Sequence, residues 1–234
     1  MKIKSLPAAK LSKSFENYAS IIEKNTRKKH KIDDNEYIYG LKNFGDRFEA
    51  EGQLPQFNKI AKRLAETLVN LHNDKLAGVI YNILIKLNRE TDLKLVEDVA
   101  TKALAIARRE YNPVFIAART NDLKEIYKFT EYGSDRHLKL LREEKRALKE
   151  ICENYDGITK KMQSISGKHM RPIEKYQEML AAIRLEIAEV LIKRGEDTKN
   201  ATEELLLSQT YYSKFPEGHN AKKIAAILKK LSSK

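Results

Sequence analysis

Apolar residues recur every three or four positions along most of the chain, the spacing that places side chains on one face of an α-helix. Residues 55–71 are a clear example, because Ile60, Leu64 and Leu68 lie one helical turn apart with polar residues between them. The same spacing is repeated as far as residues 220–231. We therefore predict an all-α protein of about ten helices, in which antiparallel pairs form an irregular α-solenoid or a helical bundle.

Polar capping residues and turn-forming residues mark where these helices begin and end. Asn73, Asp92 and Ser134 each precede a helical run, and their side chains are of the types that accept hydrogen bonds from the first amides of a helix. Asp33 and Glu36 have the spacing of a capping box for another helix. Further breaks are expected near Gly52, at residues 112–113, at residues 120–122 between a short helix over 113–119 and the next, at Gly133 and at Gly195.

One apolar run, VIYNILIKL at residues 79–87, has the length and composition of either a buried strand or a helix. It lies between two helical patterns, and the chain offers no other convincing strand to pair with it. We therefore assign it to a helix.

The segment over residues 156–172 differs in composition from its surroundings. It combines Gly, Ser and Pro with four basic residues and a single acidic one, which is typical of a loop or linker. This predicts four parts: a basic N-terminal helix and arm over 1–31, a helical body over 32–155, a basic linker over 156–172 and a C-terminal helical unit with a basic last helix over 173–234.

The C-terminal unit resembles a tetratricopeptide repeat, over about residues 176–231. The resemblance is carried by small residues where two helices would cross, by a glycine at the turn between them and by a proline after the second helix: Ala182, Ala188, Gly195, Ala201, Tyr212, Phe215 and Pro216. The Asn-Asp pairs at 73–74 and 121–122 are interpreted as similar helix-turn-helix joints. The resemblance implies a helical-repeat scaffold that binds a protein partner on its concave face.

Composition and charge limit the function classes. The chain has only 9 Gly and 5 Pro among its 234 residues, too few turn signals for a sandwich or barrel. Its formal net charge is +12, and all of this excess lies in residues 1–31 and 220–234. The 188 residues between them carry equal numbers of basic and acidic side chains. The basic character is therefore expected to act at the ends of the chain.

These basic segments are expected either to act as solubilising tails or to contact an anionic partner. The leading hypothesis is an acidic protein partner bound by a non-catalytic scaffold. The alternative is nucleic acid bound by the Lys-rich ends and the loop over 160–171, and a third option is docking of the last helix on a membrane surface. The candidate contact residues are Lys28, Lys29, Lys31, Lys160, Lys161, Lys168, Arg171, Lys222, Lys223, Lys229 and Lys230.

The sequence offers little that indicates catalysis. The five histidines are scattered, and none has another His, Cys or Glu three or four residues away, the spacing that would place two metal ligands on one helix face. The single cysteine, Cys152, is interpreted as a small core residue, and Glu186 with Glu189 as part of a solvated ionic face. We predict a non-enzyme that needs no cofactor or metal. Without a signal peptide or an apolar span of about 18 residues, the protein is expected in the cytoplasm, with an oligomeric state that the sequence leaves open.

Overall fold

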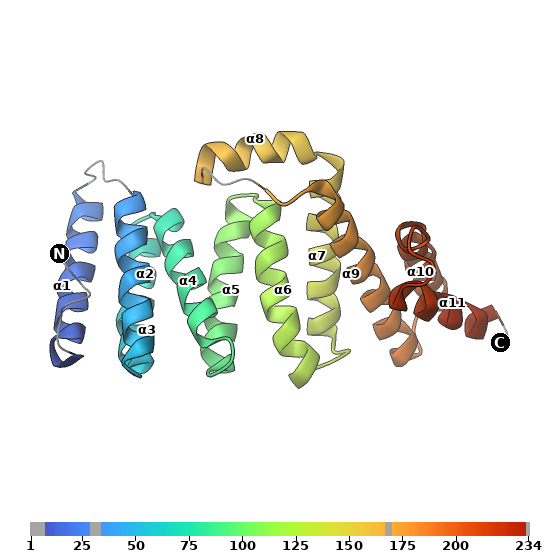
Figure 1. The fold of residues 1–234 in the computed structure, drawn as a ribbon, viewed down its shortest axis with the longest axis horizontal. Helices are drawn as coiled ribbons and strands as arrows, with labels where there is room; N and C mark the ends of the chain where they lie inside the picture. Colours follow the sequence, from blue (N-terminus) through green and yellow to red (C-terminus); the bar gives the residue numbers. More distant parts are fainter. Residues whose placement is uncertain (1–7, 29–33, 167–169, 233–234) are drawn as a thin grey trace. The chain divides into compact units, whose positions relative to one another are not determined.

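The computed structural model describes residues 8–28, 34–166 and 170–232 (Figure 1). Within these ranges the chain forms 11 α-helices and no strand, which confirms the all-α prediction. None of the helices described there is long and apolar enough to cross a membrane. The chain divides into two compact units, Met1–Arg109 and Glu110–Lys234. Asp33, expected to begin a helix, lies outside the described residues.

The first unit is a stack of helices in two layers. Its helices are α1 (Ala8–Arg27), α2 (Asp34–Ala50), α3 (Leu54–Asn70), α4 (Asp74–Asn88) and α5 (Leu93–Arg109). Helix α1 packs on α3 and α2 packs on α4, while α3 and α5 are joined by ion pairs. Contacts with both the next helix and the next but one are typical of an α-solenoid. The apolar run at residues 79–87 lies in α4, as predicted.

Aromatic side chains fill the core between the first three helices. The Phe15 ring of α1 lies 4.9 Å from the ring of Phe44 and 5.0 Å from that of Phe57, measured between centroids. All three rings are fully buried, and such pairs add to the stabilisation that comes from burying apolar area. This cluster holds α1 and α2 on α3.

The predicted capping residues begin their helices. The Asn73 side chain accepts a hydrogen bond from the Leu76 amide at 3.2 Å, and Asp92 accepts one from the Leu95 amide at 3.0 Å. Ser134 does the same for the helix that follows it, accepting from the His137 amide at 3.1 Å. Each bond satisfies an amide that has no partner inside its own helix.

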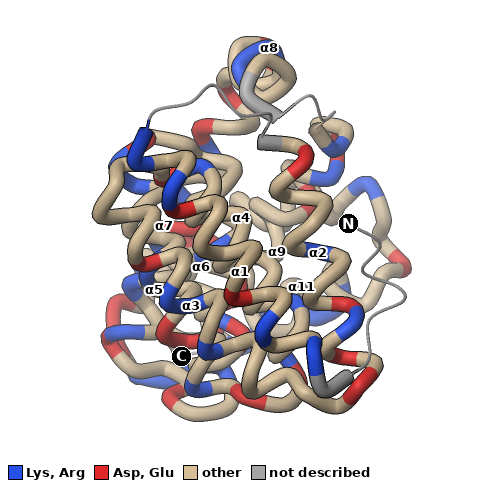
Figure 2. Tube along the Cα trace, turned by 90° about the vertical axis from the view of Figure 1, so that its left-hand side faces the viewer, with Lys and Arg blue, Asp and Glu red and all other residues tan. Residues whose placement is uncertain are grey.

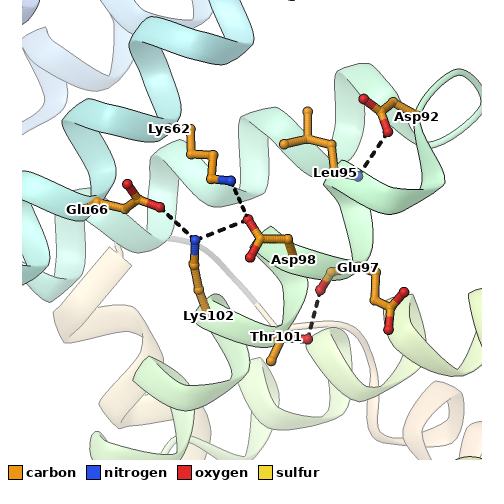
Figure 3. A network of polar contacts seen from close by, with 8 residues as sticks. All are labelled: Lys62, Glu66, Asp92, Leu95, Glu97, Asp98, Thr101 and Lys102. Carbon is orange, nitrogen blue, oxygen red and sulfur yellow. Dashed lines mark hydrogen bonds and ion pairs between the residues drawn. The ribbon is translucent and has the colours of Figure 1, made fainter.

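An ionic network on the surface ties α3 to α5 (Figure 3). The Lys102 ammonium lies 2.6 Å from a Glu66 carboxylate oxygen and 3.1 Å from one of Asp98, and Lys62 lies 2.8 Å from the same Asp98 oxygen. All four side chains are about a third exposed or more, so water screens the pairs and each contributes little to stability. The network fixes how the helices are aligned more than it stabilises them.

The second unit is built in the same way, with one additional helix. Its helices are α6 (Pro113–Thr130), α7 (Asp135–Glu153), α8 (Tyr155–Ser166), α9 (Ile173–Arg194), α10 (Thr198–Tyr212) and α11 (His219–Ser232). Helix α7 packs between α6 and α9, and α9 packs on α10. Helix α8 departs from the stack and runs across the direction of α6 and α7 (Figure 1). One continuous apolar core extends from Ala117 to Ile224.

The predicted break at residues 120–122 is wrong, because α6 continues through it. The polar side chains that suggested a turn are used inside the helix. Thr120 is fully buried, and its hydroxyl donates to the carbonyl oxygens of Ile116 at 2.8 Å and Ala117 at 3.1 Å. Asp122 is buried too and pairs with Arg119 at 3.3 Å. Tertiary packing of these residues outweighs their preference for turns.

The predicted linker over 156–172 is mostly helical, since α8 extends to Ser166. Ile158 and Met162 lie four residues apart, so they share one helix face, and both are buried in the core of the second unit. The Tyr155 hydroxyl donates to the Arg171 carbonyl at 2.7 Å, which joins the two ends of this segment. The division between the compact units falls instead at residues 109–110.

The positions that carry the repeat resemblance are partly where it placed them. Gly195 ends α9 in the left-handed conformation at a φ of 67°, and Ala188 and Ala201 are fully buried between helices. Ala182, however, is exposed. The close approach of α9 and α10 occurs one residue earlier, where the buried Ser208 hydroxyl donates to the Ala181 carbonyl at 2.8 Å.

Candidate binding surface on helix α7

Helix α7 has two faces of opposite character. One face carries His137, Leu141, Glu144 and Leu148, all buried against α6 and α9. The other face points to solvent and carries a row of cations. Because residues that are three, four or seven positions apart lie along one side of a helix, the same 19-residue element supplies both core and surface.

An open groove of about 520 Å³ runs along the solvent face of α7. Its lining is Asp135, Leu138, Lys139, Arg142, Lys145 and Arg146. Leu138 is almost fully buried and contributes an apolar floor. Four of these six side chains are cationic, so the groove is suited to a negatively charged ligand.

Three of the groove cations are free to bind. Lys139, Arg142 and Arg146 are exposed and make no ion pair with any residue that the structure describes. By contrast, Lys145 pairs with Glu204 of α10, and Asp135 pairs with Arg194 of α9 at 2.7 Å. These pairs neutralise the edges of the groove and attach α7 to its neighbours.

A buried group of charges lies on the opposite face of the same helix. The Lys124 ammonium of α6 lies 3.3 Å from a Glu144 carboxylate oxygen and 3.5 Å from one of Glu186 on α9. His137 Nε2 lies 3.8 Å from the other Glu186 oxygen. His137 is 0% and Glu144 2% exposed, so three helices meet at a cluster that is almost free of water.

Burial shifts the protonation equilibria of this cluster. It raises the pKa of the Glu144 carboxyl to about 7, although the neighbouring Lys124 opposes the change. Burial also lowers the pKa of His137. The Gly133 amide donates to His137 Nδ1 at 3.2 Å, so in the neutral ring the proton lies on Nε2, facing Glu186. For Lys124, burial favours the neutral amine, but the charges of Glu144 and Glu186 outweigh it and the pKa rises.

The described cations that were predicted from the sequence are divided between the two units. Lys28, at the end of α1, belongs to the first unit, and the other described candidates belong to the second. Lys160, Lys161 and Arg171 are exposed on or after α8. Lys29, Lys31 and Lys168 lie outside the described residues. Figure 2 shows lysines and arginines distributed over many helices, with acidic residues among them.

Two of the predicted cations at the C-terminal end are already paired. Lys222 lies 2.8 Å from Glu217, and Lys223 pairs with Glu189 of α9. Lys229 and Lys230 are exposed in the last turn of α11. On this helix Ile224 is fully buried, and Ile227 and Leu228 pack against the core, which occupies the apolar side that membrane docking would need.

The row on α7 was missed because the chain from residue 32 to 219 is neutral as a whole. The signal is nevertheless present in the sequence: Lys139, Arg142 and Arg146 have the spacing of one helix face. Finding it requires knowing which face of the helix is buried, and that depends on the neighbouring helices.

Groups suited to catalysis are few in the part of the chain that the structure describes. It contains no set of three His, Cys, Asp or Glu residues that could hold a metal ion. Burial raises the pKa of the Cys152 thiol, and its half-buried side chain packs against the core. A thiol in this setting is a poor nucleophile.

Comparison with known proteins adds no family: the chain matches no protein-family model, and no curated protein has significant similarity to it.

Proposed function

We propose that this protein is a non-catalytic helical scaffold whose second unit binds an acidic segment of a protein partner along α7. The observation that carries the proposal is the row of exposed, unpaired cations Lys139, Arg142 and Arg146 in a groove with an apolar floor. The packing of neighbouring helices in both units supports a scaffolding role, because stacked helices present long surfaces to partners.

The spacing of the row sets the size of the ligand. From Lys139 to Arg146 the helix advances about 10 Å, at about 1.5 Å per residue. This length matches two or three acidic side chains on an extended or helical peptide. Arginine guanidinium groups bind carboxylates through two parallel hydrogen bonds, so Arg142 and Arg146 are expected to contribute most of the specificity.

The backbone beneath the row is held firmly. Leu141 and Leu148, on the core side of α7, are fully buried, and Lys145 is tied to Glu204 of α10. A rigid helix loses little conformational entropy when a ligand binds, which favours affinity.

Protein is a better fit to this groove than nucleic acid. The cationic row is short and is interrupted by Glu143 and followed by Glu150 on the same helix, which suits a short acidic segment better than a continuous phosphate backbone. The lining contains no aromatic side chain on which a base would stack. The nucleic-acid alternative depends on cations that are dispersed over the chain or already paired.

The test is fluorescence anisotropy with the full-length protein and a labelled oligoglutamate peptide as probe. The wild type is expected to bind the peptide with an affinity that falls as salt is added. Arg142→Glu/Arg146→Glu is expected to weaken binding at least tenfold, the effect of about 1.4 kcal/mol.

A matched control has the same change in net charge. Lys42→Glu/Lys199→Glu replaces exposed lysines that do not line the groove and is expected to bind within about twofold of the wild type. Equal loss in both double variants would mean that total charge, not the groove, binds the peptide. Preference for single-stranded DNA or RNA of equal charge over the peptide would favour the nucleic-acid alternative.

A further inference from the structure

The outward face of α10 carries apolar side chains without a helix to cover them. Leu206 and Leu207 are each 51% exposed, and Phe215, just beyond the helix, is 55% exposed. Tyr211 joins them, since its ring lies 6.0 Å from that of Phe215. A grouped apolar patch on a surface commonly marks an interaction site.

Two opposite charges flank this patch along the helix. Glu203 lies three residues before Leu206, and Lys214, just beyond the end of the helix, lies three residues after Tyr211. Both are exposed, and neither makes an ion pair with a described residue. The Lys214 ammonium lies 5.4 Å from the centroid of the Tyr211 ring, a contact that leaves it accessible to an anion.

We infer that this face binds a second copy of the chain, with the α10 helices antiparallel about a twofold axis. Under such symmetry each residue that contacts its counterpart does so twice. Glu203 precedes Leu206 by the same three positions by which Lys214 follows Tyr211. A register that sets Leu206 against Tyr211 of the other copy therefore also sets Glu203 against its Lys214.

In this register opposite charges face each other and apolar side chains of the two copies pack together. The two ion pairs lie at the ends of the contact, and the leucine and tyrosine side chains lie between them, the arrangement of an apolar centre with a polar rim. The face of a single helix is smaller than the approximately 800 Å² per partner of a standard interface. Association is therefore expected to be weak, with a dissociation constant in the micromolar range.

The test is sedimentation velocity of the full-length protein from about 1 µM to about 1 mM. The wild type is expected to pass from monomer to dimer over this range. Leu206→Arg/Leu207→Arg is expected to weaken the dimer at least 100-fold, because it removes apolar burial from both copies and places like charges together. Phe129→Ser, which removes an exposed ring on α6, is the control and is expected to dimerise like the wild type.

A charge exchange tests the register itself. Glu203→Lys and Lys214→Glu, made singly, are each expected to weaken the dimer about tenfold, since each places two like-charged pairs across the axis. The double exchange Glu203→Lys/Lys214→Glu is expected to restore it. Thermal melting verifies that each variant folds. A wild type that stays monomeric throughout, a leucine variant that still dimerises, or a double exchange without recovery overturns the inference.

Discussion

Glu144 is an acidic side chain in a place where carboxylates are seldom found. It is 2% exposed and shares the interior of the second unit with His137 and Lys124. A buried charge needs a partner to offset the loss of hydration, and Lys124 serves Glu144 and Glu186 at once. Burial raises the pKa of the Glu144 carboxyl to about 7, because the Lys124 ammonium only partly offsets the loss of hydration and Glu186 adds a second negative charge nearby. Glu144 and His137 are therefore each expected to make the free energy of unfolding depend on pH.

Replacing Glu144 by glutamine is expected to change how stability depends on pH. The carboxyl has a pKa near 4.5 when unfolded and of about 7 when folded, so between these values the folded protein holds the extra proton. The stability from this group is fully present below pH 4.5 and is lost as the pH rises through 7. The melting temperature of the wild type minus that of Glu144→Gln should therefore fall over this range. A constant difference would contradict the burial of an ionisable carboxyl.

His137 is expected to act in the opposite direction. Because its pKa is lowered in the folded protein, the unfolded chain binds a proton first, and stability is lost as the pH falls below the unfolded value of 6.5. The melting temperature of the wild type minus that of His137→Gln should decrease on acidification, whereas the corresponding difference for Glu144→Gln increases. The charge of Glu125 raises the pKa of both groups, and that of Lys128 lowers the pKa of His137. Parallel changes in the two differences would refute the assignment.

At the scale of single helices, local signals in the sequence were sufficient wherever the chain turns by means of its own residues. Asn73, Asp92 and Ser134 were predicted as caps from their type and position, and each accepts the expected bond. The predicted helix break was wrong where contacts with other residues hold a polar side chain inside a helix. Asp122, assigned to a turn, is held inside α6 by Arg119, and this contact becomes visible only when the helix has formed.

The same distinction explains α8 and the groove. The Gly and Ser residues of 156–166 favour a loop locally, whereas Ile158 and Met162 gain more from burial in the core than the helix loses. The cationic row of α7 could not be predicted for a related reason. The net charge of a long segment can be zero even when one face of one helix carries several cations. The fold class needs only periodicity, but a surface site requires knowledge of what covers each face.

Packing of Met162 is expected to hold α8 in place. The Met162 side chain is buried, and its sulfur accepts a hydrogen bond from the side-chain amide (Nδ2) of Asn112 at 3.4 Å. Met162→Ala should cost about 2–5 kcal/mol of local packing and should speed hydrogen exchange in α8 while α9 and α10 keep their protection. Lys160→Ala, at an exposed position of the same helix, should leave exchange unchanged. Slow exchange of α8 in Met162→Ala would show that other contacts hold it.

At the scale of the molecule, each unit has its own core, and the boundary at residues 109–110 differs from the one that composition suggested. The core of the second unit includes Ala117 and Leu141 as well as Ile187 and Ile224. A fragment that begins at residue 173 therefore lacks the core side chains that α6, α7 and α8 contribute, such as Ala117, Leu141 and Met162. In stacked helices, stability comes from the interfaces between neighbours. The two possible boundaries therefore predict different stabilities for fragments of the chain.

A fragment of residues 110–234 is expected to be helical by circular dichroism and to unfold in one cooperative transition, because it retains the whole of its core. A fragment of residues 173–234 is expected to show low helicity and no cooperative transition, since α9 loses its contacts with α7 and marginal helices depend on tertiary packing. Urea titration of both, followed at the helical signal, makes the comparison. Cooperative unfolding of the shorter fragment would restore the boundary predicted from composition, and loss of structure in the longer one would mean that the second unit depends on the first for its stability.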